Sequence, residues 1–244
     1  MKNQTISDAS DDPMGAAIVD YHRTGSADQL IVMSSDFDDD EIPVSELFRS
    51  FDAMSPIEQT ALRYAKGKIL DVGAGAGCHS LALQDMGKTV TSIDISPLSV
   101  EVMVARGVKD VRIQDFFADG FCGQYDTILM LMNGIGIIGT LANLPIFLAQ
   151  ADQLLAPGGQ ILVDSSDLRY LYEDDNGGID HTDFPHYYGE VDFRMRYRDI
   201  IGSTFRWVYI DYNTLSAAAA AHGFKAELIQ EGAHYDYLAR LTRA

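Results

Sequence analysis

The sequence predicts an α/β fold with a doubly wound, mostly parallel sheet, and three observations carry that prediction. Short apolar runs alternate with helical segments between residues 67 and 164. A glycine-rich turn at residues 73–77 joins the first run to the first helix. The runs are apolar throughout, which is typical of strands buried on both faces of a sheet. Strands separated by helices form parallel sheets with right-handed crossovers.

The expected elements follow one another along the chain in a regular order. Five strands are expected at residues 68–72, 89–94, 111–113, 125–132 and 160–164. The helices that connect them are expected at residues 79–86, 97–106 and 140–155. A last helix at 212–222 precedes two further strands, at 224–230 and 235–242. The sheet should therefore have seven strands, with an antiparallel strand at its C-terminal end.

Two regions lie outside this alternation. Residues 1–15 are polar and acidic without the apolar block of a signal peptide, which predicts a disordered tail. Residues 16–66 predict an N-terminal helical cap, because apolar residues recur there at spacings of three and four and Ser55-Pro56 is a helix start. The main domain is then 67–244. Inside it, residues 165–211 are an insertion after the fifth strand, a loop followed by a β-hairpin.

The composition narrows the classes of partner. Acidic residues number 36 against 18 Lys and Arg, giving a formal net charge of -18. Such a charge repels phosphate backbones, so we expect a small-molecule substrate and no nucleic acid. Cys78 and Cys122 do not make a disulfide framework, and no apolar stretch is long enough to span a membrane, which predicts a cytoplasmic protein. The oligomeric state is not predicted.

The stretch from Ile69 to Gly77 is the most informative part of the chain. Gly73 and Gly75 allow a sharp turn and the close approach of a ligand to the backbone. The same features open a dinucleotide site, but there the third glycine would stand at Cys78, and here it falls one residue early. Asp71 precedes the turn, and a carboxylate suits a ligand with an amino group and a sulfonium better than a pyrophosphate.

Four later motifs accompany this stretch: Asp94 in 92–96, Gln114-Asp115-Phe116, residues 125–128 leading to Asn133-Gly134, and residues 154–159. Together the five motifs resemble the class I S-adenosylmethionine-dependent methyltransferases over residues 66–164 and 212–244. The resemblance implies a Rossmann-like sheet and S-adenosyl-L-methionine as cofactor. It implies that the glycine turn holds the methionine part, that Asp94 holds the ribose hydroxyls, that Ile95 packs on the adenine and that an acid after the third strand binds the adenine amine. The cofactor residues expected from it are Asp71, Gly73, Ala74, Gly75, Gly77, Asp94, Ile95, Gln114, Asp115, Phe116, Asn133 and Gly134.

The acceptor side is less defined by the sequence. Methyl transfer from a sulfonium requires alignment, exclusion of water and, for some acceptors, removal of a proton. We expect the pocket at the ends of the fourth and fifth strands and in residues 165–211. The candidate catalytic residues are His181, His186 and Tyr170. Arg49 is a candidate for the cofactor carboxylate if the cap folds over the glycine turn.

Alternatives to a small-molecule methyltransferase stay open at this point. They are a non-catalytic module that binds the cofactor, a nicotinamide-dependent oxidoreductase and an enzyme that methylates a basic protein. No metal is assigned, because the histidines and cysteines do not fall at zinc spacing. The acidic run 36–41 lacks the glycine and glutamate of a calcium loop and predicts a solvated loop.

Overall fold

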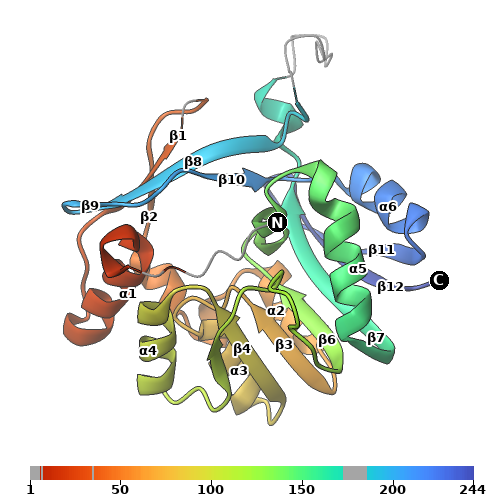
Figure 1. Cartoon of the computed structure of the whole chain (residues 1–244), viewed down its shortest axis with the longest axis horizontal. Helices are drawn as coiled ribbons and strands as arrows, with labels where there is room; N and C mark the ends of the chain where they lie inside the picture. The colour runs from red at the N-terminus through yellow and green to blue at the C-terminus, as the bar shows by residue number, and fades with distance from the viewer. Residues whose placement is uncertain (1–5, 7, 35, 173–185) are drawn as a thin grey trace.

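Two sheets make up the fold of this 244-residue chain. The structure is a computed structural model that describes residues 6, 8–34, 36–172 and 186–244. A seven-stranded sheet carries helices on both faces, and an antiparallel sheet of five strands lies over one end of it (Figure 1). The predicted α/β class is therefore confirmed.

The larger sheet has the strand order β11-β12-β7-β6-β3-β4-β5. Its strands are β3 (Lys68–Val72), β4 (Thr89–Asp94), β5 (Val111–Ile113), β6 (Tyr125–Met130), β7 (Leu155–Ser166), β11 (Phe224–Glu231) and β12 (Asp236–Arg243). The strands from β3 to β7 pair in parallel, and β12 pairs antiparallel with both β7 and β11. The order reverses between β3 and β6, and ligands bind doubly wound sheets at such a switch point.

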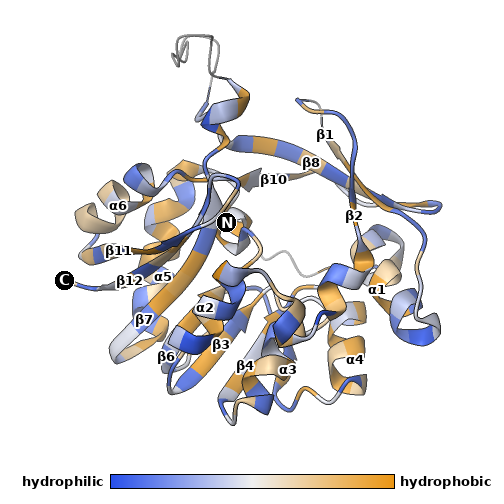
Figure 2. Ribbon diagram, turned by 180° about the vertical axis from the view of Figure 1, so that it is seen from behind, coloured by the Kyte–Doolittle hydropathy of each residue, from blue (hydrophilic) through white to orange (hydrophobic). Residues whose placement is uncertain are grey.

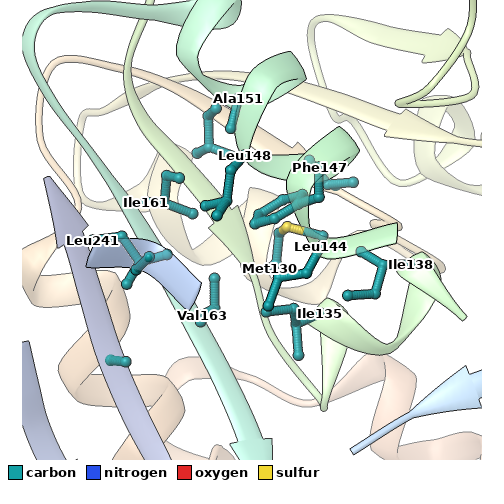
Figure 3. Packing of buried hydrophobic residues seen from close by; sticks show 14 of the residues in the cluster. Met130, Ile135, Ile138, Leu144, Phe147, Leu148, Ala151, Ile161, Val163 and Leu241 are labelled. Carbon is teal, nitrogen blue, oxygen red and sulfur yellow. The ribbon is translucent and has the colours of Figure 1, made fainter. Parts of the chain in front are cut away.

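Helices cover both faces of the larger sheet, and successive residues of each central strand point alternately to one face and the other. The α-helices are α1 (Pro13–Thr24), α2 (Pro56–Tyr64), α3 (Cys78–Asp85), α4 (Pro97–Ala105), α5 (Leu144–Leu154) and α6 (Tyr212–Ala221). Leu70 and Ile128 face α5 and α6, while Ile69 and Leu129, one position away, face α2 and α3. Figure 3 shows the first of these two cores, where Phe147 and Leu148 of α5 pack on the sheet.

Short 3-10 helices fill several connections. They are η1 (Ala9–Asp11), η2 (Val44–Phe48), η3 (Phe51–Ala53), η4 (Gly134–Ile138), η5 (Leu141–Asn143) and η6 (Leu168–Leu171). Residues 9–15, part of the expected tail, form η1 and the first turn of α1. The side chain of Asp12 caps α1 by accepting a hydrogen bond from the Gly15 amide. Among the described residues, no helix is both long and apolar enough to cross a membrane.

The smaller sheet has the order β10-β8-β1-β2, with β9 paired to β8. Its strands are β1 (Leu30–Ser34), β2 (Asp40–Ile42), β8 (Glu190–Tyr197), β9 (Ile200–Ile201) and β10 (Phe205–Val208). β1 pairs antiparallel with β8, with Leu30 opposite Tyr197. The N-terminal cap is thus not wholly helical, since 30–42 supplies two strands. The reason is tertiary: β1 is stabilised by a partner in the insertion 165–211, which sequence periodicity does not reveal.

The smaller sheet is anchored on the larger one through a close contact. A Cβ atom at Gly136 would lie 1.9 Å from Nε1 of Trp207, so η4 and β10 approach to a distance that only glycine permits. The Glu190 carboxylate accepts a hydrogen bond from the Leu141 amide at 2.9 Å. Figure 2 shows the smaller sheet from behind, arched over one end of the larger sheet.

Candidate active site

The glycine turn follows β3 and leads into α3. Gly73, Gly75 and Gly77 have φ angles of 69°, 55° and 81°, which are left-handed and strained for any other residue. A Cβ at Gly77 would also lie 2.9 Å from Met103 Cγ of α4. The turn therefore needs glycine both for its backbone conformation and, at Gly77, for the packing of α4.

Asp94 ends β4 next to this turn. Its Oδ2 accepts a hydrogen bond from the Gly75 amide at 2.8 Å, and its Oδ1 accepts one from the Ser96 amide at 2.9 Å. Burial raises the pKa of Asp94 to about 6, the two backbone amides oppose the shift, and the nearby Asp12 carboxylate adds to it. The carboxyl group is thus fixed beside the glycine turn, at the switch-point edge of the sheet.

Asp71 lies beneath the turn rather than in contact with solvent. Its side chain accepts a hydrogen bond from the Ser80 hydroxyl, and Ser80 Oγ lies 2.6 Å from Ser92 Oγ. Burial raises the pKa of Asp71, and the charge of His79 opposes the rise. These contacts tie the end of β3 to α3, the helix that follows the turn.

The residues after β5 form the next part of this edge. Asp115 is buried, and its Oδ1 accepts a hydrogen bond from the Phe117 amide at 2.8 Å. Gln114 donates from its side chain to the Asp115 carbonyl at 2.7 Å. Phe116 packs within the main core against Phe147. A hollow of about 380 Å³ is lined by Gln114 and Asp115 with neighbours from 112–122.

The turn after β6 stands opposite the glycine turn across the switch point. Met132 and Asn133 have φ angles of 62° and 54°. Oδ2 of Asp164, from β7, accepts a hydrogen bond from the Met132 amide at 2.9 Å. Asn133 Oδ1 accepts one from the Ser166 hydroxyl at 3.0 Å, and Gly134 is buried. The structure thus brings the ends of β3, β4, β5 and β6, at which the predicted residues stand, to one edge of the sheet.

A buried ion cluster, which the sequence analysis did not identify, joins the cap to this edge. Glu58 Oε1 lies 2.8 Å from both Arg49 Nη2 and His79 Nε2. Burial opposes the charge of Glu58, but the hydrogen bond and charge of His79 outweigh it and lower the pKa to about 2. Burial lowers the pKa of His79, but the hydrogen bond to Glu58 and the charges of Asp71 and Glu58 outweigh burial, so the pKa is raised. The signals in the sequence were the Ser55–Glu58 capping box and a histidine next to the glycine turn.

Arg49 reaches the edge of the sheet from the cap. Besides Glu58, its guanidinium pairs with Glu46 at 2.6 Å, and its Nη2 lies 3.8 Å from the sulfur of Met132. The Arg49 side chain is 15% exposed. The cap therefore places a positive charge beside the Met132 turn.

The candidate catalytic residues have different surroundings. His181 lies outside the described residues. His186 is exposed and lines a hollow of about 390 Å³ together with Arg169, Tyr188 and Asp211 among others. Tyr170 is 43% exposed, and its ring stacks on that of Tyr235 with centroids 4.6 Å apart. The structure therefore gives no contact that joins Tyr170 to His186.

Acidic residues anchor the tyrosines next to this hollow. The Tyr187 hydroxyl donates to Asp211 and the Tyr188 hydroxyl donates to Asp167, both at 2.7 Å. Burial first, and then these hydrogen bonds, raise the pKa of both tyrosines. The hydroxyls thus stay protonated and act as hydrogen-bond donors rather than bases. In the part of the chain that the structure describes, no three His, Cys, Asp or Glu side chains group as metal ligands.

Comparison with known proteins agrees with this geometry. Residues 45–228 match a family model described as a methyltransferase domain, so the chain belongs to this family and is a class I S-adenosylmethionine-dependent methyltransferase. A solved structure of a SAM-dependent methyltransferase from Bacteroides fragilis, in complex with S-adenosyl-L-homocysteine, is 60% identical. It matches with a TM-score of 0.93 over 99% of this chain and 98% of that one.

Two curated relatives match over a shorter stretch. A demethylmenaquinone methyltransferase from Tropheryma whipplei (strain Twist) is 31% identical over 100 residues. A ubiquinone biosynthesis O-methyltransferase from Caulobacter sp. (strain K31) is 27% identical over 104 residues. Each match covers 39% of this chain, and the chain spans only 40% and 39% of these relatives' lengths.

Proposed function

We propose that this protein transfers the methyl group of S-adenosylmethionine to a small-molecule acceptor at the carboxyl edge of its larger sheet. Its cofactor is S-adenosylmethionine. The observation that carries the proposal is the placement of Asp94 at the end of β4, bonded to the Gly75 amide of the glycine turn. A fixed carboxylate there is suited to accept hydrogen bonds from two vicinal hydroxyls, as on a ribose.

The cofactor is proposed to lie along the edge from β5 to β6. Asp94 would hold the ribose, Ile95 and Asp115 the adenine, and the glycine turn the methionine part. Arg49 would bind the methionine carboxylate, because Arg49 is the cation that the cap brings to the Met132 turn. Glu58 and His79 would hold Arg49 in place for that contact. Asp71 would favour the cofactor's positive charges from below the turn.

The acceptor is proposed to bind over the ends of β6 and β7 and against the insertion 165–211. Its methyl transfer needs the nucleophile in line with the sulfonium methyl and water kept out. His181 and His186 are proposed as general bases, of which His186 lies in the described hollow beside Tyr188. Tyr170 is proposed to wall the acceptor site. A net charge of -18 favours a small acceptor over nucleic acid.

Calorimetry with the full chain tests the cofactor site. S-adenosyl-L-homocysteine should bind, and Asp94→Ala should weaken it by about tenfold or more, because two charged hydrogen bonds are lost. Asp85→Ala, which removes an exposed acid of α3, is the matched control and should bind like wild type. Micromolar NADH binding with hydride transfer, or equal affinities of wild type and Asp94→Ala, contradicts the proposal.

Turnover separates an enzyme from a module that only binds the cofactor. Candidate amines, phenols and acids are incubated with the protein and S-adenosylmethionine carrying a labelled methyl group. Transfer of the label to one of these small acceptors supports the proposal. Label that appears only in added basic proteins would favour protein methylation instead.

A further inference from the structure

The turn after β6 has a backbone conformation that its residues do not readily adopt. Met132 and Asn133 are both left-handed, with φ angles of 62° and 54°, and neither is glycine. Two such residues in succession persist only where surrounding contacts hold them. This turn stands at the carboxyl edge of the sheet, where the proposed reaction takes place, so the contact that holds it bears on the chemistry.

Asp164 supplies that contact from the neighbouring strand. β6 and β7 run in parallel with Met130 beside Val163, which puts the next residue of β7, Asp164, beside the turn. Its Oδ2 accepts the Met132 amide at 2.9 Å, and its Oδ1 accepts the Gly134 amide at 3.4 Å. The side chain is buried. An ionised carboxylate accepts on both oxygens, whereas a carboxamide or a protonated acid places a donor on one side.

The turn carries groups that face three parts of the molecule. Asn133 Oδ1 is occupied by the Ser166 hydroxyl, so the donor end of its carboxamide is the end that a ligand would meet. The sulfur of Met132 touches the guanidinium of Arg49 in the cap. Gly134 opens η4, which reaches the close contact of Gly136 with Trp207 in the smaller sheet.

We propose that Asp164 is a positioning residue for methyl transfer, whose two backbone hydrogen bonds hold Met132 and Asn133 in place at the reaction edge. Asn133 then presents its carboxamide to the acceptor, and Met132 supports Arg49 against the cofactor carboxylate. The role at the reaction rests on the proposed function. The two hydrogen bonds by which Asp164 holds the turn lie within the protein, so that part of the proposal does not depend on the proposed function.

The charge of Asp164 is sensitive to pH in the neutral range. Burial raises the pKa of Asp164 to about 7, against the amides of Met132 and Gly134 and the charge of His79, which lower it. Among the described residues, the titratable groups of His79 from α3 and of Tyr237 from β12 interact with its charge. Below this pKa the group protonates and loses one of its two acceptor positions, so the turn should loosen as the pH falls.

Trp207 reports on the turn without any ligand. The chain contains one tryptophan, and it lies against Gly136 of η4. The emission of the full-length protein should change between about pH 6 and pH 8, with a midpoint near 7. The change should be absent in Asp164→Asn and retained in Asp152→Asn, which neutralises an exposed acid of α5 paired with Arg243. A flat wild-type profile, or the same transition in Asp164→Asn, overturns the proposal.

Binding of S-adenosyl-L-homocysteine supplies the second readout. Asp164→Asn should weaken it by about tenfold, the loss of a charged, buried hydrogen bond. Met132→Gly alone measures the loss of the contact between Met132 and Arg49. In that background Asp164→Asn should weaken binding much less than it does in wild type, because glycine adopts the left-handed conformation without a partner. An equal loss in both backgrounds would mean that Asp164 contacts the ligand directly and would overturn the positioning role. If wild type fails to bind at all, the proposed function fails, while the tryptophan profile still tests the hold of Asp164 on the turn. If Asp164→Asn does not fold, the double variant with Met132→Gly, whose turn needs no partner, takes its place in that profile.

Discussion

Asp12 and Ser96 share a buried hydrogen bond in which the serine hydroxyl donates to the carboxylate. Asp12 caps α1, and Ser96 caps α4 immediately after Asp94 and Ile95. One hydrogen bond therefore ties the start of the N-terminal cap to the loop that holds the proposed ribose and adenine contacts. The Ile6 amide also donates to the Ile95 carbonyl at 3.1 Å. The N-terminal segment thus packs against the proposed cofactor edge.

Asp12→Ala should loosen this edge. The variant loses a helix cap and a buried hydrogen bond, so the free energy of unfolding should fall by about 1–3 kcal/mol. S-adenosyl-L-homocysteine should also dissociate faster, because the start of α1 is no longer tied to the loop that carries Ile95. Stopped-flow displacement measures the rate. Asp8→Ala removes the cap of η1 but not this contact, and it should leave the rate unchanged.

Cofactor affinity should depend on pH through Asp94. Its pKa of about 6 means that the carboxyl group is neutral below this pH and ionised above it. Since the ionised form accepts both ribose hydroxyls, affinity should be constant above about pH 7 and fall toward tenfold per unit below pH 6. Calorimetry from pH 5 to 8 gives the profile. Asp94→Asn should flatten it below pH 6, and an unchanged slope in that variant would assign the titration to another group.

Glu58→Gln should be among the more destabilising single changes in the cap. It leaves Arg49 and His79 without their shared carboxylate in a buried setting, and breaking such a cluster typically costs about 3–5 kcal/mol. The folded pKa of about 2 lies below the ordinary value of 4.5, so this stabilisation is present above pH 4.5 and is lost as the pH falls toward 2. Urea unfolding at pH 7 and pH 3 should show the difference between wild type and variant shrinking at the lower pH.

Gly136→Ala should force the two sheets apart. The added Cβ would overlap the indole of Trp207, and overpacking of this kind costs about 1–3 kcal/mol. Thermal unfolding of Gly136→Ala, Trp207→Leu and the double variant forms a cycle. If the overlap is the cause, the double variant should lose less stability than the sum of the two single variants. Strict additivity would place the strain elsewhere.

The larger sheet could be predicted from the sequence because its signals are local, and the residues proposed for the cofactor were chosen from the same local signals. Asp71 with the glycine turn, Asp94 at a strand end and Gln114-Asp115 after the next strand each lie within a few residues of the element that positions them. The parallel topology then brings these strand ends to one edge. The roles of the individual residues stay predictions, and Phe116 shows why, since it lies in the core against Phe147.

The smaller sheet and the ion cluster could not be predicted because their partners lie far apart in the chain. Residues 30–34 are a short apolar stretch whose strand conformation depends on 193–197. The raised pKa of His79 depends on its contact with Glu58. In the sequence, Glu58 is already accounted for by the capping box with Ser55, so nothing there indicates a contact with His79. In the sequence, Asp164 is only the last residue of a predicted buried strand. Its further role comes from the hydrogen bond that it accepts from the backbone of the neighbouring turn.

The pairing of β1 with β8 has a consequence for folding during synthesis. As the chain leaves the ribosome, β1 and β2 emerge early, but the strand that completes their sheet is made only after the central strands β3 to β7. Until then β1 has an open edge, which invites pairing with other chains. Sequence-distant pairing also slows folding. The nascent chain can therefore close the smaller sheet only after the central strands of the larger sheet have been made, and α6, β11 and β12 emerge later still.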